Sequence, residues 1–268
     1  ALSRRCGVSS SSDNGAASEA FARLCQLPTT AANSFFRFSF LSFATMPSAL
    51  IISTSASKMG DHDTGAWLEE VAAPYYVFKA KGLNVDVASI SGGAIPWDQG
   101  SMQGDFFTAD CKRFMDDADA QAIVKNTKAL ANVDILSYDG IYLAGGHGTC
   151  TDFYGNQDLY SAVDKVFAAG KVVGADCHGP IGLIGCKKTD GTPLVAGKKV
   201  TGFTDSEERA VGLTDKVPAL IESEFRKLGA DFQAGADWGV NVVVDGKLVT
   251  GQNPASSTKC AEAFVAAL

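Results

Sequence analysis

The chain alternates short apolar runs with helical segments, and this alternation is the feature that most restricts its fold. The runs expected to form strands lie at 48–54, 83–90, 140–146 and 171–176, and the expected helices lie at 64–82, 119–130, 158–170 and 256–268. A late segment, 241–251, is typical of a β-hairpin turning at Asp245-Gly246. Strands that alternate with helices form βαβ units, so the sequence predicts an α/β fold with a mainly parallel sheet.

The first 45 residues differ in composition from the rest. They contain four arginines and no lysine, and Asp13 and Glu19 are their only acidic residues. Arginine- and serine-rich, acid-poor N-termini resemble organelle transit peptides. A disordered leader upstream of a true start at Met46 is an equal alternative. We expect residues 1–45 to be a leader and residues 46–268 to form a single domain.

The net charge, the apolar runs and the cysteines of the chain limit its possible partners and its cellular location. The net charge of −7 argues against nucleic acid and anionic membranes as partners. No run of 18 apolar residues occurs, so no membrane-spanning segment is expected. Seven cysteines without a CxxC motif favour free thiols in a reducing compartment. The predicted location is the cytoplasm, or a plastid or mitochondrion if the leader is a transit peptide.

Two polar stretches directly follow predicted strands. They are GGHGTC (145–150) and CHGP (177–180). Ligands of parallel sheets bind outside the carboxyl ends of the strands. We therefore expect these two stretches to form the functional site.

The stretch around Cys177 has the pattern of a nucleophile elbow. Such a turn needs small residues two before and two after the nucleophile, and Ala175 and Gly179 occupy those positions. A helix opening after the turn would lower the pKa of the thiol and favour the thiolate. His178 would add positive charge or carry a proton. The competing interpretation is a buried structural cysteine beside a turn histidine.

The glycine stretch predicts an oxyanion-binding loop. Successive glycines after a strand leave backbone N–H groups free to face an anionic oxygen. A dinucleotide loop beginning at Gly146 would need a glycine where Thr151 stands, and no G-x-x-x-x-G-K-[ST] motif occurs. We expect His147 to be a turn residue or pocket wall.

A structural zinc site is not predicted. His147 and Cys150 have H-x-x-C spacing, and Cys177 and Cys186 lie downstream. No second closely spaced pair completes a tetrahedral set of ligands.

A carboxyl group near the thiol is expected from one of two clusters. In the first, Glu69 and Glu70 point about 100° apart on a helix, so only one of them can face the sheet. Trp67, Val71 and Pro74 mark the apolar side of the helix, and Glu70, flanked by Trp67 and Pro74, can lie close to it. A buried carboxyl there would have a raised pKa and could act as a general acid and base, whereas an exposed one would be an ordinary helix residue.

The second cluster lies in FTDSEER (203–209). It offers Asp205, Glu207 and Glu208. One of these carboxylates could orient His178 through a hydrogen bond, or the segment could simply begin a capped helix.

Taken together, the motifs resemble the DJ-1/PfpI superfamily, and within it the glyoxalase III and heat-shock chaperone branch. The motifs are TG-x-W-x-x-E-x-x-x-P (64–74), AGGHG (144–148), ADCHGP (175–180), GK-x-x-TGFTD-x-E-E (197–208) and LVTGQNPAS (248–256). The resemblance extends from about residue 47 to the C-terminus. It implies a flavodoxin-like three-layer α/β sandwich with a nucleophile elbow, and a homodimer.

The resemblance also assigns roles to residues. It implies that Cys177 is the nucleophile, with His178 beside it in a catalytic triad. Glu70 is the implied acid and base that hydrogen-bonds the thiol. Glu208 matches the triad acid, with Asp205 as the alternative.

The implied activity is the glutathione-independent conversion of methylglyoxal to lactate and of glyoxal to glycolate. The implied substrates are small 2-oxoaldehydes, with no metal or organic cofactor. Gly145, Gly146 and His147, together with His178, would supply contacts to the substrate oxygens.

One related function is excluded, and others remain open. A class I glutamine amidotransferase is excluded, because it needs a histidine well downstream of the cysteine and no histidine follows His178. A cysteine peptidase would need a groove for peptide, which the sequence does not show. A holding chaperone or redox-stress sensor is the non-enzymatic alternative, because exposed thiols of low pKa oxidise readily. Protein deglycase activity is a related alternative.

Overall fold

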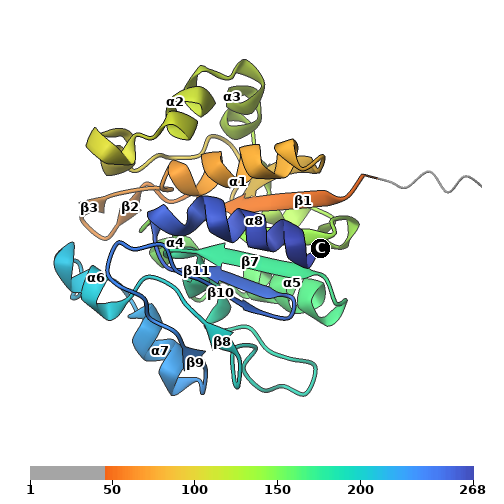
Figure 1. Cartoon of the computed structure of the whole chain (residues 1–268), viewed down its shortest axis with the longest axis vertical. Coiled ribbons are helices and arrows are strands. Elements are labelled where there is room, and N and C mark those ends of the chain that lie inside the picture. Colours follow the sequence, from red (N-terminus) through yellow and green to blue (C-terminus); the bar gives the residue numbers. More distant parts are fainter. Residues whose placement is uncertain (1–45) are drawn as a thin grey trace, which may run out of the picture. The chain divides into compact units, whose positions relative to one another are not determined.

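A seven-stranded sheet forms the centre of the computed structural model, which describes residues 46–268 (Figure 1). In sheet order the strands are β10 (Val242–Asp245), β11 (Leu248–Gly251), β7 (Val172–Asp176), β6 (Gly140–Leu143), β1 (Ser48–Ser53), β4 (Asn84–Ser89) and β5 (Lys128–Ala129). Every neighbouring pair is parallel except β10 and β11, which form an antiparallel hairpin at one edge. The predicted leader, residues 1–45, lies outside the described residues.

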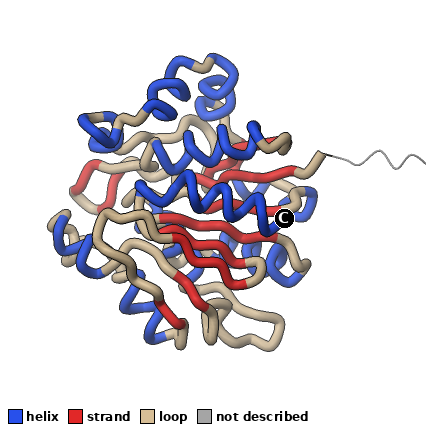
Figure 2. Tube along the Cα trace, viewed as in Figure 1, coloured by secondary structure: helices blue, strands red, loops and turns tan. Residues whose placement is uncertain are grey.

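Helices cover both faces of the sheet, which makes the three layers of the predicted α/β sandwich (Figures 1 and 2). On one face lie α1 (Glu69–Ala80), α2 (Ala109–Asp116), α3 (Ala118–Lys125) and α8 (Ser257–Ala267), and on the other lie α4 (Thr149–Asp152) and α5 (Gln157–Ala168). The remaining elements are the short pairs β2 (Lys58–Met59) with β3 (His62–Asp63) and β8 (Lys199–Val200) with β9 (Asp231–Phe232), and the helices α6 (Asp205–Ala210) and α7 (Ile221–Lys227).

The apolar strands form because both of their faces are covered. Along β1, Ile51 packs in the core against α1 and α8, whereas its neighbours Leu50 and Ile52 pack in the core on the α5 side. This alternation follows from the two-residue period of a strand. A strand that is buried on both faces can be apolar throughout, as is typical of parallel sheets.

The predicted α/β class and mainly parallel sheet are confirmed, and three local boundaries differ from the prediction. The helix expected over 64–82 begins only at Glu69, because Ala66 and Trp67 donate their N–H groups to Pro96 and Gly145 instead of to a helical turn. The helix expected over 119–130 ends at Lys125, and Lys128–Ala129 form the edge strand β5.

The predicted hairpin turns one residue later than expected. Asp245 is already paired with Leu248, so the turn consists of Gly246 and Lys247. Gly246 has a φ of 62°, which suits glycine in a two-residue turn.

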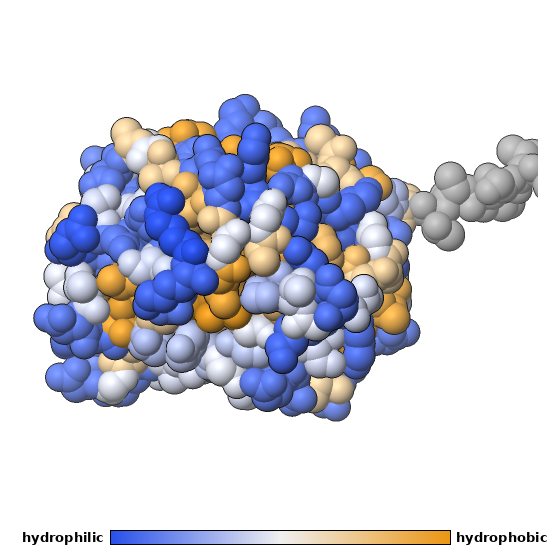
Figure 3. All heavy atoms as spheres, turned by 90° about the horizontal axis from the view of Figure 1, so that it is seen from below, coloured by the Kyte–Doolittle hydropathy of each residue, from blue (hydrophilic) through white to orange (hydrophobic). Residues whose placement is uncertain are grey.

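Within residues 46–268, no helix is long and apolar enough to cross a membrane. The surface in Figure 3 shows hydrophobic residues in limited patches among hydrophilic ones.

Candidate active site

Cys177 occupies a strained turn directly after β7. Its φ is 51°, a left-handed value that is uncommon outside glycine. The turn is fixed on both sides, because the Cys177 N–H donates to the Gly251 carbonyl (3.1 Å) and its carbonyl accepts from the Phe203 N–H (2.9 Å). Gly179 packs so closely on the Leu143 carbonyl that a Cβ there would overlap with it. The predicted elbow and its need for a small residue two positions after the cysteine agree with this geometry.

The expected lowering of the thiol pKa is wrong. The segment after the turn, Gly179–Leu183, is a short 3₁₀-helix and not the α-helix on which that expectation rested. The pKa of the Cys177 thiol is raised well above its usual value, because the side chain is buried and the carboxyl groups of Glu70 and Asp176 lie nearby. The resting site therefore favours the thiol, and a base must remove its proton during the reaction.

Glu70, in the first turn of α1, supplies the buried carboxyl group that the sequence predicts near the thiol. Its side chain is 0% exposed, and neither carboxyl oxygen has a hydrogen-bond partner among the described residues. Desolvation, and then the charge of Asp176, raise the pKa of this carboxyl, although the nearby Cys177 thiol and Gly145 backbone partly counteract the shift. The carboxyl group also lies against Gly145, where an added Cβ would overlap with Glu70 Oε2.

Glu69 points away from the thiol. It accepts a hydrogen bond from the Thr108 hydroxyl (2.5 Å) and one from the Cys111 thiol (3.3 Å). Its pKa is raised by partial burial. The prediction that only one of the two adjacent glutamates faces the sheet is confirmed.

A carboxylate joins two histidines beside the thiol. His178 Nδ1 is 3.3 Å from Cys177 Sγ, and its Nε2 is 2.7 Å from Glu208 Oε2. His147 Nε2 is 2.8 Å from the other oxygen, Glu208 Oε1. Because a carboxylate only accepts hydrogen bonds, both histidines carry their proton on Nε2. The Nδ1 atom of His178 is consequently an acceptor facing the thiol.

The titration of this cluster favours a neutral imidazole beside a carboxylate. Burial, and then the neighbouring His147, lower the pKa of His178 to about 4. Burial alone would raise the pKa of Glu208, but the two histidines outweigh it and lower that pKa to about 2. At neutral pH, His178 is therefore an uncharged imidazole whose Nδ1 lone pair faces the thiol.

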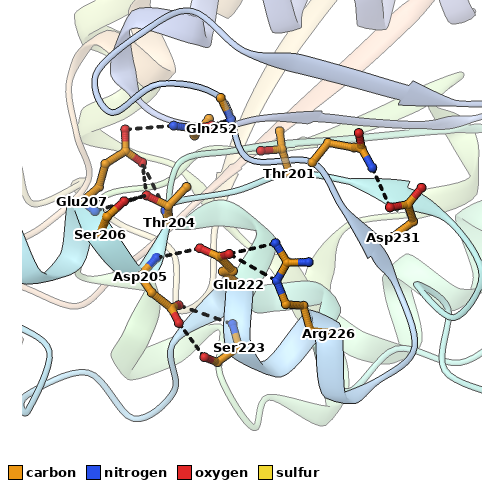
Figure 4. A network of polar contacts seen from close by, with 12 residues as sticks. Thr201, Thr204, Asp205, Ser206, Glu207, Glu222, Ser223, Arg226, Asp231 and Gln252 are labelled. Carbon is orange, nitrogen blue, oxygen red and sulfur yellow. Dashed lines mark hydrogen bonds and ion pairs between the residues drawn. The ribbon is translucent and has the colours of Figure 1, made fainter.

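Of the three acidic residues predicted near 205–208, only Glu208 contacts the histidines. Asp205 is bound instead to the start of α7, where its carboxylate accepts from the hydroxyl of Ser223 (2.5 Å), as Figure 4 shows. Glu207 forms a capping box with Thr204 at the start of α6. The segment thus both caps a helix and orients His178, the two alternatives that the sequence left open. The alternative triad acid, Asp205, has no contact with His178.

The glycine loop lies over the nucleophile and presents free backbone donors. Gly146 has a φ of 96°, and a Cβ there would overlap with the backbone of Trp67. The N–H groups of Gly146, His147 and His178 have no acceptor among residues 46–268. These donors are of the kind that binds an anionic oxygen.

A small cavity of about 110 Å³ lies over Cys177. Its lining comprises Trp67, Phe106, Gly146, His147, Cys177, His178, Phe203, Val211, Trp238 and Pro254. A larger cavity of about 280 Å³ shares four of these residues: Trp67, Phe106, Trp238 and Pro254. Sequence reasoning missed most of the aromatic wall, because residues such as Phe106 and Trp238 come from irregular segments that show no periodicity.

Within the described residues, one group could offer ligands to a metal ion. His147, His178 and Glu208 bring their ligand atoms within 4.8 Å of one another. Both Nε2 atoms are already hydrogen-bonded to Glu208, so the three groups satisfy one another without an ion.

Comparison with known proteins identifies the family. The model of the DJ-1/PfpI family matches residues 64–267, a range that contains the elbow, the glycine loop and Glu208. The chain belongs to the DJ-1/PfpI family. This confirms the resemblance drawn from the motifs.

Relatives and solved structures agree with this assignment. The chain is 36% identical to "Glyoxalase 3" of Candida albicans over 213 residues, which cover 76% of this chain and 89% of that protein. It is also 36% identical to "Glutathione-independent glyoxalase HSP31" of Saccharomyces cerevisiae, over 76% of this chain and 90% of that one. The crystal structure of glyoxalase III from Candida albicans superimposes with a TM-score of 0.77 and 34% identity, over 83% of this chain and 98% of that one.

Proposed function

We propose that this DJ-1/PfpI protein is a glutathione-independent glyoxalase that converts small 2-oxoaldehydes to 2-hydroxy acids. Methylglyoxal would give lactate and glyoxal would give glycolate, the reaction of a hydro-lyase of the D-lactate dehydratase type. The observation that carries this proposal is the Cys177 thiol, which lines a small cavity and lies near both the His178 imidazole and the buried Glu70 carboxyl group. The names of the Candida and Saccharomyces relatives support the same activity.

In the first step the thiol adds to the aldehyde carbon. His178 Nδ1, 3.3 Å from Cys177 Sγ, takes the thiol proton while the S–C bond forms. Glu208 stabilises the imidazolium through Nε2. His178 then returns the proton to the former carbonyl oxygen, which gives a hemithioacetal.

In the second step a proton moves between the two substrate carbons. Glu70 in its carboxylate form removes the proton from the carbon bonded to sulfur. The raised pKa makes this form a stronger base and also makes it a smaller fraction of the enzyme at neutral pH. The free N–H groups of Gly146 and His178 stabilise the oxygen of the enediolate. Glu70 returns the proton to the neighbouring carbon, while the hydroxyl proton on the sulfur-bearing carbon moves to the oxygen of that neighbouring carbon. The sulfur-bearing carbon is thereby oxidised to a thioester, and its neighbour is reduced to an alcohol.

In the last step water hydrolyses the thioester. The water oxygen bonds to the carbonyl carbon, the C–S bond breaks and the sulfur regains its proton. The products are the 2-hydroxy acid and the free Cys177 thiol.

The test is turnover of methylglyoxal by the purified protein without glutathione, followed as lactate formed. We expect Cys177→Ala to abolish turnover, whereas Cys186→Ala, a matched buried thiol on the α5 side of the sheet, should retain it. Turnover by Cys177→Ala would overturn the thiol mechanism. Lactate formation that requires added glutathione would overturn the proposed activity.

The family resemblance also supports a homodimer as the working form. Light scattering should then give twice the mass of one chain.

A further inference from the structure

Within residues 46–268, the two non-glycine residues with left-handed backbone line the same cavity. They are Cys177, with a φ of 51°, and Trp238, with a φ of 62°. Such conformations cost of order 1–3 kcal/mol each and concentrate at functional sites. The proposed mechanism explains why Cys177 has this backbone conformation, but it gives no role to the same conformation at Trp238.

A buried carboxylate holds Trp238 in this conformation. Glu207 is 0% exposed, and its Oε1 atom accepts the Trp238 N–H at 2.8 Å. The same oxygen accepts from the side-chain amides of Gln252 (3.1 Å) and Asn253 (2.8 Å). The other oxygen accepts from the Thr204 N–H (3.1 Å), and Figure 4 shows Glu207 between Thr204 and Gln252. These contacts fix the Trp238 backbone from the α6 side.

The held tryptophan contributes to an aromatic wall at the entrance of the site. We call Trp67, Phe106 and Trp238 the aromatic subsite, because all three line both the cavity over Cys177 and the larger cavity beside it. The Trp67 and Phe106 rings meet edge to face, with centroids 5.1 Å apart. Trp238 and Phe106 are 43% and 47% exposed, so they retain apolar surface that a ligand could cover.

The aromatic subsite is much larger than the methyl group of methylglyoxal. The two cavities have volumes of about 110 and 280 Å³, and the side chain of a bound aldehyde would extend from the first into the second. Aromatic side chains favour edge-to-face or offset contacts with another ring. Glu69 and Asp105 also line the larger cavity and disfavour an anionic side chain.

We propose that the aromatic subsite binds the ring of an uncharged aryl 2-oxoaldehyde, and that Glu207 is the positioning residue that holds Trp238 for this purpose. The inference rests on the proposed glyoxalase function and names a substrate class for it. Phenylglyoxal is the simplest such compound, and it would be converted to mandelate by the same addition, proton transfer and hydrolysis.

The experiment compares kcat/KM for phenylglyoxal and methylglyoxal in the full-length protein. We expect phenylglyoxal to be favoured by about tenfold, since fully burying a ring of phenylalanine size shifts an equilibrium by roughly ten- to a hundredfold. Trp238→Ala should remove most of this preference, because it should raise KM for phenylglyoxal much more than KM for methylglyoxal. Trp238→Phe should restore much of the preference, and Val240→Ala, at an exposed residue of the same segment, should not change it.

The test of the positioning role of Glu207 needs a measurement that a general loss of structure would not change in the same way. Glu207→Gln should raise KM for phenylglyoxal much more than KM for methylglyoxal. Equal loss with both aldehydes in a folded Glu207→Gln protein would overturn the positioning role. If that variant does not fold, the shift in the phenylglyoxal preference between Trp238→Ala and Trp238→Phe decides the proposal.

A binding experiment separates the subsite from the activity. Acetophenone carries the same ring but cannot undergo the reaction, and its ring protons should receive saturation transfer from the wild-type protein and much less from Trp238→Ala. Equal transfer in both proteins, or a phenylglyoxal preference unchanged by Trp238→Ala, would overturn the subsite. If methylglyoxal is not turned over at all, the proposed function fails, and the acetophenone measurement still decides whether the ring binds.

Discussion

At the scale of single residues, the site consists of polar groups that the fold does not fully satisfy. Glu70 is buried without a hydrogen-bond partner among the described residues, and Cys177 is held at a positive φ. A buried group without a partner costs about 1–3 kcal/mol. Active sites typically contain residues whose conformation or burial lowers the stability of the fold but serves the reaction.

Glu70→Gln should therefore reduce turnover far more than Glu69→Gln. The amide keeps the shape of the carboxyl group but cannot act as the base, and loss of general base catalysis costs roughly a hundred- to ten-thousandfold in kcat. Glu69 contacts Thr108 and Cys111 instead of the thiol, so its amide variant should keep most of the activity. Steady-state kinetics with methylglyoxal measure both, and equal losses would refute the choice of Glu70.

The same substitution should change how stability depends on pH. The folded pKa of Glu70 lies well above its ordinary value of 4.5, so between these two values the folded state binds more protons than the unfolded state. The wild type consequently loses stability from this group as pH rises above 4.5, with a limiting slope of about 1.4 kcal/mol per pH unit. Glu70→Gln lacks this loss. In denaturant titrations from pH 5 to 8, the free energy of unfolding of the variant should therefore rise relative to that of the wild type. A difference that is constant with pH would contradict the raised pKa.

At the scale of elements, the sequence predicts what depends on local pattern. The apolar runs 48–54, 140–146 and 171–176 form β1, β6 and β7. The rule that ligands bind at the carboxyl ends of parallel strands correctly predicts that GGHGTC and CHGP lie together. The start of α1 was missed, because the N–H groups of Ala66 and Trp67 are bound by distant loops. Trp238 was missed for a similar reason, since only the folded chain brings it beside Glu207.

The close packing between the glycine loop and the elbow gives an element-scale prediction. A Cβ at Gly145 would overlap with Glu70 Oε2 and lie 2.7 Å from both the Asp176 carbonyl oxygen and the His178 nitrogen. Gly145→Ala should therefore displace the loop from the nucleophile, destabilise the protein by about 1–3 kcal/mol and abolish most turnover.

Gly191→Ala is the control for this substitution. Gly191 has a φ of 82° with nothing near its missing Cβ, so an alanine there should cost backbone strain of about 1 kcal/mol and leave turnover intact. Thermal unfolding and methylglyoxal kinetics measure the two effects. A fully active Gly145→Ala protein would show that the loop does not need this close approach.

At the scale of the whole molecule, the sheet brings together groups that are far apart in sequence. Glu70 lies in the first turn of α1, and Glu208 lies in α6. Gly146 follows β6, and Cys177 follows β7. The cavity over Cys177 is complete only when these segments pack around the sheet. Activity should therefore depend on the integrity of the sheet from β1 onward.

Deletion of residues 1–45 tests the predicted single domain of residues 46–268. Pro47 accepts the Asn84 N–H (2.9 Å), and β1 begins at Ser48, so a protein that starts at Met46 keeps this contact and every strand of the sheet. We expect its methylglyoxal turnover and its thermal unfolding temperature to match those of the full-length chain. Deletion of residues 1–53 is the matched control, because it removes β1 from between β4 and β6 and should prevent folding. A folded but inactive protein starting at Met46 would mean that residues before it contribute to the site.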